Sequence, residues 1–188
     1  VDCIRSIKEK TLGCSYEIIV VDNNSPNRDI ENLRSEFADV NLILHPYNNG
    51  FGSGNNVGAK VAKGDFLFFL NSDTLLLNDA VSILCNYIKN NPIVGVCGGN
   101  LYSLNHAPTT SFSVQQPSIL SDLDYFFFNA FSKIKYKKST FFNYTNEPMV
   151  IEGSISGANY LIRTKLFHEI GGFDEDFFMY YEETELSY

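Results

Sequence analysis

Residues 64–74 read Gly-Asp-Phe-Leu-Phe-Phe-Leu-Asn-Ser-Asp-Thr, and this stretch decides the fold class. The five bulky apolar residues from Phe66 to Leu70 follow a glycine turn, and they are typical of a strand buried on both faces. In open α/β folds the carboxyl ends of such strands deliver polar side chains to the edge where ligands bind. We therefore expect Asn71 and Asp73 to lie at a ligand-binding edge of an α/β sheet.

Asp73 allows two interpretations. A single carboxylate at a strand end suits a divalent cation that takes its other oxygen ligands from a phosphorylated substrate. The competing interpretation is an aspartate that caps its own turn, as aspartate often does after a strand. Residues 71–74 alone do not separate the two, so the other motifs must be considered.

The composition describes one domain of ordinary size. The chain has 188 residues, 44% of them hydrophobic, which is enough for a full core. The net charge of −8 argues against non-specific nucleic-acid binding, which needs a basic surface. The longest apolar runs are far shorter than the roughly 20 residues that span a bilayer. Cys3, Cys14, Cys85 and Cys97 lack metal-ligand spacing, so we predict reduced, buried thiols in a cytoplasmic protein.

Strand-like and helix-like segments alternate along the first two-thirds of the chain. The expected strands there are 16–21, 41–45, 66–70 and 94–97, and regularity returns after residue 147 with a strand at 160–163. The expected helices are one from Ser25 through Phe37, one of small residues that stops near Gly64, one at 79–89, and one that ends at Ile170 before Gly171 and Gly172. This alternation predicts βαβ units, a parallel sheet and right-handed crossovers.

Residues 103–147 lose this pattern. They are rich in aromatic residues and contain a basic group at Lys133, Lys135, Lys137 and Lys138. We favour an insertion whose aromatic side chains complete a small satellite core. The alternative is an acceptor-binding or membrane-surface element, since lysines and aromatics together suit an anionic interface.

Three further motifs carry polar or glycine residues suited to ligand binding. Asp22 ends the first strand, where a carboxylate can accept an N–H from a pyrimidine ring or can start a helix. Gly50, Gly52 and Gly54 open a helix after a strand, but Asn55 breaks the dinucleotide pattern, so we expect no nicotinamide site. Phosphate binding by the backbone amides of this loop stays open.

The third motif is acidic and lies near the end of the chain. Six acids fall within residues 173–185, interleaved with aromatic residues. Burial in a partly apolar cleft raises the pKa of a carboxyl group and makes it a usable general base. The competing interpretation is an acidic first turn favoured by the helix dipole, which would explain Glu182 and Glu183 without catalysis.

Together these motifs resemble the family 2 glycosyltransferases of the GT-A fold, especially the bacterial polysaccharide branch that includes rhamnosyltransferases. The resemblance covers nearly the whole chain apart from the aromatic insertion, and it rests on the order of five motifs. They are Val20–Ser25, Asn49–Asn56, Leu70–Thr74, Ser156–Ala158 and Gly171–Glu175 with Tyr181–Glu183.

The resemblance implies a role for each motif. Asp22 and Asn24 would lie at the nucleotide base, Asn55 would line the donor pocket, and Asn71 and Asp73 would meet the diphosphate. Asp73 would hold Mg²⁺ or Mn²⁺. Ser156 and Gly157 would border the sugar and acceptor. The catalytic base would be Glu183, with Glu182 beside it.

The same resemblance divides the single catalytic domain into three parts. Residues 1–102 would form the nucleotide-binding half, 103–147 the insertion, and 148–188 the half that holds the acceptor and the base. Asn71 stands where the family has the first acid of its D-x-D motif, and Glu183 stands where it usually has aspartate. The family's opening strand has no counterpart before Val1, so we expect further chain at both ends and one open side on the strand at 16–21.

The resulting hypothesis is an inverting, metal-assisted glycosyltransferase of cell-surface polysaccharide synthesis. Its partners would be a nucleoside-diphosphate sugar and a glycan or lipid-linked acceptor, with peripheral association at the inner face of the membrane. One alternative is a nucleotidyltransferase, which would share the sheet, the metal and the phosphates. Another is a non-catalytic domain of the same fold that binds glycan or assembles with a partner.

Overall fold

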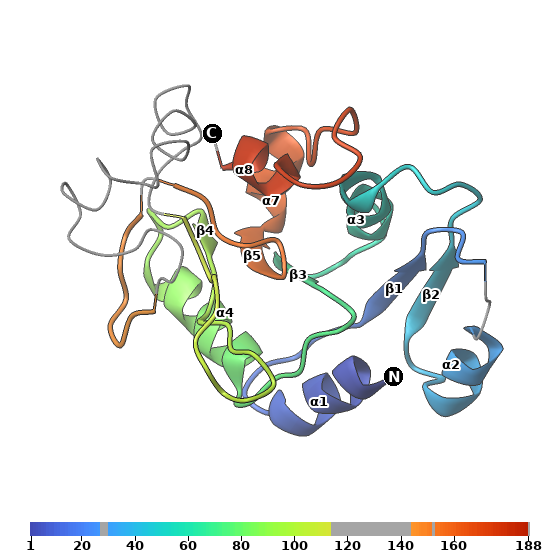
Figure 1. Cartoon of the computed structure of the whole chain (residues 1–188), viewed down its shortest axis with the longest axis horizontal. Helices are drawn as coiled ribbons and strands as arrows, with labels where there is room; N and C mark the ends of the chain where they lie inside the picture. The colour runs from blue at the N-terminus through green and yellow to red at the C-terminus, as the bar shows by residue number, and fades with distance from the viewer. Residues whose placement is uncertain (27–29, 114–143, 152, 188) are drawn as a thin grey trace.

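The computed structural model describes residues 1–26, 30–113, 144–151 and 153–187, and every structural statement concerns these ranges. In chain order the elements are α1 (Asp2–Lys10), β1 (Ile19–Asp22), α2 (Ile30–Glu36), β2 (Asn41–Leu44), α3 (Phe51–Ala59), β3 (Phe66–Leu70), α4 (Ala80–Asn90), β4 (Val96–Cys97), β5 (Asn159–Arg163), α7 (Thr164–Glu169) and α8 (Glu182–Leu186). Figure 1 shows the strands at the centre with helices around them. The α/β class predicted from the sequence is confirmed.

The described strands form two sheets. β1 and β2 pair in parallel, with Ile19 opposite Asn41 and Asp22 opposite Leu44. The second sheet has the order β3-β5-β4, and β5 is antiparallel to both of its neighbours. The alternating pattern predicted a mainly parallel sheet, and the antiparallel pairing of β5 with both neighbours departs from it. β5 comes from a distant part of the chain, so no βαβ crossover sets its direction when it enters between β3 and β4.

β1 has one open edge within the described ranges, because it pairs there with β2 alone. This agrees with the expectation that the first strand would lack a neighbour on one side. The strand begins at Ile19, three residues later than expected, because its pairing partner β2 spans only four residues.

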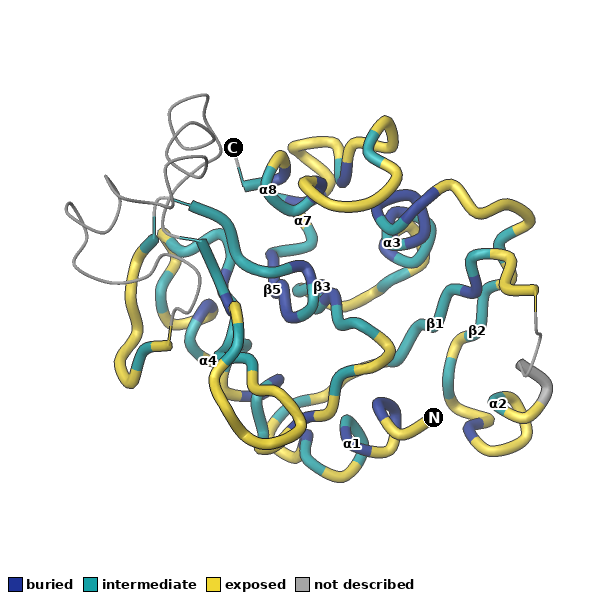
Figure 2. The backbone as a smooth tube through the Cα atoms, viewed as in Figure 1, coloured by how far each residue is buried: buried dark blue, intermediate teal, exposed yellow. Residues whose placement is uncertain are grey.

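β5 provides the centre of the hydrophobic core. On one face Tyr160 and Ile162 pack in a cluster with Leu67, Phe69, Phe167, Phe173, Ala59 and Leu186. On the other face Leu161 packs with Ile88 and Cys97 under α4. β5 is therefore dark blue along most of its length in Figure 2. This accounts for its continuous run of apolar residues, which is typical of a strand covered on both sides.

An aromatic cluster attaches the last part of the chain to this sheet. The ring centroid of Phe69 lies 5.1 Å from that of Phe167 and 5.0 Å from that of Phe173, and Phe167 lies 5.6 Å from Phe173. Such edge-on and tilted contacts contribute about 0.5–1.5 kcal/mol each beyond the burial of area. The segment before α8 is thereby held against β3, the strand that leads to Asp73.

Several sequence expectations concern residues outside the described ranges, among them most of the aromatic insertion and its four lysines. Its described ends form bridges from Tyr102 to Pro108 and from Phe112 to Ile155. All four cysteines are free, as expected, with Cys3 and Cys97 buried and Cys14 and Cys85 half-buried. Among the described helices none is long and apolar enough to cross a bilayer.

Candidate active site

The end of β1 is tied to the start of α3. Asp22 is buried, and its Oδ1 accepts a hydrogen bond of 3.1 Å from the Ser25 backbone N–H. The next residue, Asn23, donates from Nδ2 to the Gly50 carbonyl oxygen at 2.7 Å. Asn24 is exposed and has a left-handed φ of 59°. Asp22 thus organises its own turn through one oxygen, while Asn23 holds this turn against the glycine motif.

The glycine motif is used for close packing of the backbone. Gly50 has a φ of 94°, and a Cβ on it would lie 2.1 Å from the Phe178 carbonyl oxygen. The next backbone amide, on Phe51, donates to that same oxygen at 3.0 Å. The predicted glycine loop is therefore the first turn of α3, and Gly50 lets the segment around Phe178 approach the helix start.

Two asparagines of α3 have different environments. Asn55 is half-buried and donates to the Phe51 carbonyl oxygen at 3.1 Å within its own helix. Asn56 is 8% exposed, and its Nδ2 donates to the Phe173 carbonyl oxygen at 2.8 Å and to the Glu175 carboxylate at 3.0 Å. Its Oδ1 accepts a hydrogen bond of 3.0 Å from the Phe173 backbone amide. Sequence reasoning gave Asn56 no role of its own. The only signal was a second amide in a helix otherwise made of small residues.

The turn after β3 lies beside the segment Ser156–Ala158. The Asn71 backbone amide donates to the Ala158 carbonyl oxygen at 3.4 Å, and Thr74 closes the turn by donating from Oγ1 to the Asn71 carbonyl at 2.6 Å. Asp73 is exposed on this turn. No group of three potential metal-ligating side chains occurs in the described ranges.

Gly157 lies close to both Phe51 and Glu183. A Cβ built on Gly157 would lie 3.5 Å from the Phe51 ring and 3.7 Å from the carboxyl carbon of Glu183. These are ordinary van der Waals distances, and Gly157 is not among the positive-φ glycines. Neither sterics nor backbone conformation therefore requires glycine at this position, in contrast to Gly50.

The carboxylates of Glu182 and Glu183 have different degrees of burial. Glu182 is 5% exposed, and burial raises the pKa of its carboxyl group, with the neighbouring Glu183 adding to the effect. Glu183 is half-buried. In each residue Oε2 is buried without a hydrogen-bond partner in the part of the chain that the structure describes. Glu183 also helps to raise the pKa of Tyr160, which burial raises first.

These contacts join all five sequence motifs. Asn23 donates a hydrogen bond to Gly50, and the Phe51 amide donates to Phe178. Phe51 and Glu183 both approach Gly157, and the carbonyl of its neighbour Ala158 accepts a hydrogen bond from the Asn71 amide. Figure 1 shows α3 between the β1–β2 pair and the α7–α8 segment, which is the arrangement these contacts require. Glu183 therefore lies by Gly157, and the turn that carries Asp73 lies by Ala158.

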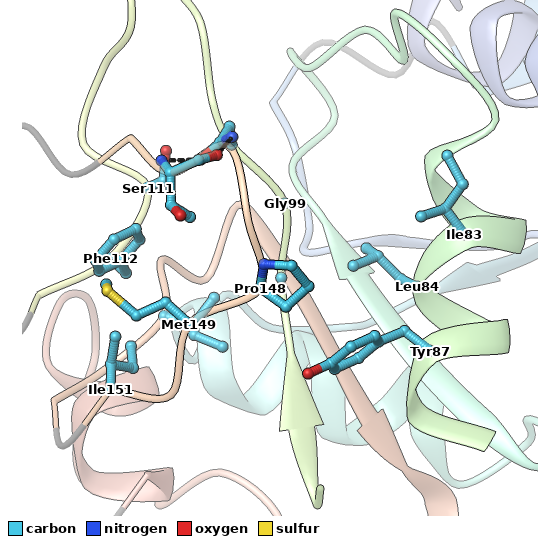
Figure 3. A pocket seen from close by; sticks show the side chains of 13 residues that line it. Ile83, Leu84, Tyr87, Gly99, Ser111, Phe112, Pro148, Met149 and Ile151 are labelled. Carbon is cyan, nitrogen blue, oxygen red and sulfur yellow. Dashed lines mark hydrogen bonds between the residues drawn. The ribbon is translucent and has the colours of Figure 1, made fainter. Parts of the chain in front are cut away.

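A separate cavity of about 210 Å³ lies between α4 and the segment around Pro148 and Met149. In Figure 3, Leu84 and Tyr87 on α4 face Pro148 across it. None of the predicted site residues lines this cavity. Its lining consists of Ile83, Leu84, Tyr87, Gly98, Gly99, Asn100, Ser111, Phe112, Thr145, Pro148, Met149, Ile151 and Ile155.

Comparison with known proteins finds a matching family model, a similar curated protein and similar solved structures. The family model "Glycosyl transferase family 2" matches residues 1–171. Rhamnosyltransferase WbbL of Escherichia coli is 26% identical over 180 residues, covering 91% of this chain and 64% of that protein. Staphylococcus aureus TarS, solved with UDP, superposes with a TM-score of 0.63 at 15% identity over 99% of this chain and 49% of its own.

A second structure extends the comparison to a donor with a metal. The mannosyltransferase of Pyrobaculum calidifontis, solved with GDP-mannose and Mn²⁺, has a TM-score of 0.59 at 16% identity. That match covers 93% of this chain and 43% of the mannosyltransferase. This chain thus spans less than two thirds of each of these proteins. The structural likeness shows that the fold is of the GT-A type, as predicted.

Proposed function

Because this chain belongs to glycosyl transferase family 2, we propose that it moves a sugar from a nucleoside-diphosphate sugar to an acceptor hydroxyl. The acceptor would be a glycan or a lipid-linked glycan of cell-surface polysaccharide synthesis. The observation that carries the proposal is the meeting of Phe51, Gly157 and Glu183. In this arrangement the half-buried carboxylate of Glu183 lies beside Gly157, a position where the fold would also accept a side chain.

The donor would bind along the loops that start at β1 and β3. Asp22 would accept a hydrogen bond from the nucleotide base through its other carboxylate oxygen, with Asn24 beside it. Asn55 would line the pocket from α3. Asn71 and Asp73, on the turn next to Ser156–Ala158, would lie at the diphosphate.

Asp73 would hold Mg²⁺ or Mn²⁺ together with the diphosphate oxygens, because its exposed carboxylate is the one acid on this turn. When bound, the cation would neutralise charge on the departing nucleoside diphosphate, an electrostatic effect that is often large in group transfer. Ser156 and Gly157 would border the sugar between the diphosphate side and the carboxylate side.

Glu183 would act as the general base. Its Oε2, which has no hydrogen-bond partner within the described ranges, would take the proton of the acceptor hydroxyl as the hydroxyl oxygen attacks the anomeric carbon. Attack from the side opposite the leaving diphosphate inverts the anomeric configuration. Glu182 is almost fully buried on the same helix, and adjacent helical residues point about 100° apart, so only one of the two faces the substrate squarely.

The workplace we propose is the cytoplasm, with peripheral association at the inner face of the membrane where lipid-linked acceptors are exposed. The negative net charge makes direct attraction to anionic lipid weak, so the acceptor itself would supply the contact.

A thermal-shift panel followed by a substrate comparison tests the function. We expect UDP, TDP or GDP to raise the Tm, and to do so more strongly with Mn²⁺ present. A nucleotide sugar should then be consumed, whereas a sugar phosphate with a nucleoside triphosphate should not. Consumption of the second pair would identify a nucleotidyltransferase. The absence of any nucleotide shift would favour a non-catalytic domain and overturn the proposal.

A further inference from the structure

Four consecutive large apolar residues are exposed immediately before α8. Phe178 is 56% exposed, Met179 54%, Tyr180 71% and Tyr181 59%. Figure 2 shows this segment in yellow between α8 and α3. Within the described ranges none of these side chains makes an aromatic ring contact or a hydrogen bond. Contiguous exposed apolar residues on a small domain are typical of an interaction or ligand-binding site.

Two of these residues also have a strained backbone. Tyr180 and Tyr181 have φ values of 70° and 71°, in the left-handed region that bulky residues avoid. Glycine or asparagine would adopt this conformation at lower cost. The tyrosine rings therefore destabilise the local backbone without packing against the core. Strain of this kind persists where a site requires it, and folding alone gives no reason for aromatic side chains here.

The contacts of this segment place it at the proposed active site. The Phe178 carbonyl accepts the Phe51 amide at 3.0 Å, next to the point where Phe51 and Gly157 meet Glu183. At its other end, the Tyr181 carbonyl accepts the Glu185 amide at 2.8 Å in the first turn of α8. The two tyrosines thus lie between the start of α3 and the carboxylate proposed as the base.

The charges around the segment indicate what it binds. Asp174, Glu175, Asp176 and Glu185 are exposed on either side of the aromatic residues, and no basic residue occurs between 169 and 188. Such a surface repels phosphate groups and anionic lipid. Carboxylates accept hydrogen bonds from hydroxyl groups, and aromatic faces pack against apolar C–H groups. An uncharged sugar ring presents both kinds of group.

We infer that Tyr180 and Tyr181 form an aromatic platform for an uncharged sugar ring of the acceptor, beside Glu183. The inference rests on the proposed function and specifies its acceptor side. The platform orients the ring so that its hydroxyl approaches Glu183, and the exposed acids around it contact the other hydroxyls. Donor binding is independent of it, because the donor residues lie on the β1 and β3 turns and on α3.

The test replaces each tyrosine with asparagine, which accepts the left-handed conformation but has no aromatic face. Tyr180→Asn and Tyr181→Asn should keep or raise the Tm, because they relieve strain, and should keep the nucleotide-induced shift. For transfer to a neutral oligosaccharide, the acceptor KM should rise roughly tenfold, the effect of losing one aromatic contact of about 1.4 kcal/mol. Tyr180→Phe should retain the wild-type KM. Tyr16→Asn, at an exposed tyrosine before β1, is the matched control.

Saturation-transfer NMR provides a readout that does not need activity. Methyl β-glucoside and methyl α-rhamnoside should receive saturation on their ring C–H protons from the wild-type chain, and much less from the double asparagine variant. Vesicles with phosphatidylserine should not bind either protein. Absence of sugar saturation with the wild-type chain, or equal saturation with the double variant, would overturn the platform. Loss of vesicle binding in the variant would assign the rings to a membrane instead.

Failure of the aromatic platform and failure of the proposed function give different results. If nucleotides bind and transfer occurs, yet the asparagine variants keep the wild-type acceptor KM, the platform is wrong and the proposed function stands. If no nucleotide shifts the Tm of the wild-type chain, the proposed function is wrong, whatever the NMR experiment shows.

Discussion

Replacing Gly157 with alanine separates the requirements of the fold from those of the site. The new Cβ would lie 3.5 Å from the Phe51 ring and 3.7 Å from the Glu183 carboxyl carbon, both ordinary contact distances. The backbone there is not in the left-handed region. An alanine that fits without strain raises the free energy of unfolding by about 0.4–1 kcal/mol, because it restricts the unfolded chain. We therefore expect Gly157→Ala to be at least as stable as the wild type.

Activity should change in the opposite direction. In the proposed site the sugar passes between the diphosphate and Glu183, so a methyl group at Gly157 takes space from the substrate. A displacement of about 1 Å at a reacting centre costs on the order of 100-fold in rate. We expect a loss of that order in transfer, with nucleotide affinity nearly unchanged because Asp22 and Asn55 are untouched.

Urea unfolding, nucleotide titration and initial-rate transfer measure the three quantities. Gly50→Ala is the control for a glycine that the fold does require. Its Cβ would lie 2.1 Å from the Phe178 carbonyl at a φ of 94°, so we expect it to lose stability by roughly 2 kcal/mol or more. The reasoning is refuted if Gly157→Ala unfolds as easily as Gly50→Ala, or if it transfers sugar at the wild-type rate.

Three further predictions follow from the site. Asn56→Ala should lower the free energy of unfolding by roughly 2–4 kcal/mol in urea melts, because it leaves the buried amide and carbonyl of Phe173 unpaired; a cost under about 1 kcal/mol would contradict this. Burial raises the pKa of Glu182, so the folded chain binds its proton more tightly than the unfolded chain, and stability falls as pH rises above about 4. Glu182→Gln should therefore gain stability over the wild type at about pH 8 in thermal melts, with the difference shrinking toward about pH 4; a constant difference would argue against a buried charge. Asp73→Asn should remove the Mn²⁺-dependent part of nucleotide affinity in calorimetric titrations and leave the Tm of the free protein unchanged, whereas equal wild-type affinity with and without chelator would exclude the metal role.

Hydrophobic periodicity was sufficient to predict most of the helices and strands. The run from Phe66 to Leu70 and the stripe along α4 carry strong signals, since each buries its own apolar residues in a regular way. The direction of β5 was not predictable from its sequence. A strand of the pattern Asn-Tyr-Leu-Ile-Arg is equally apolar in either direction, and the pairing depends on the route of the chain before it.

The candidate site was predictable as a set of motifs but not as an arrangement. The sequence pointed to Asp22 and Asp73 because each follows a strand, and to Glu183 through the resemblance to the glycosyltransferase family. The approach of Phe51 to Gly157 and Glu183 brings together residues that are more than 100 positions from Phe51 along the chain, which no local pattern encodes. The backbone strain at Tyr180 and Tyr181 could not be predicted from the sequence either, because tyrosine is not a residue expected at positive φ.

The role of Glu183 is the central claim, and a comparison of two isosteric variants tests it most directly. Transfer from a nucleotide sugar to an oligosaccharide acceptor would be measured for Glu183→Gln and Glu182→Gln, with nucleotide affinity determined for each. We predict that Glu183→Gln abolishes transfer while it binds nucleotide like the wild type, and that Glu182→Gln retains a substantial part of the activity. Full activity in Glu183→Gln, or loss of activity in Glu182→Gln alone, would contradict the account.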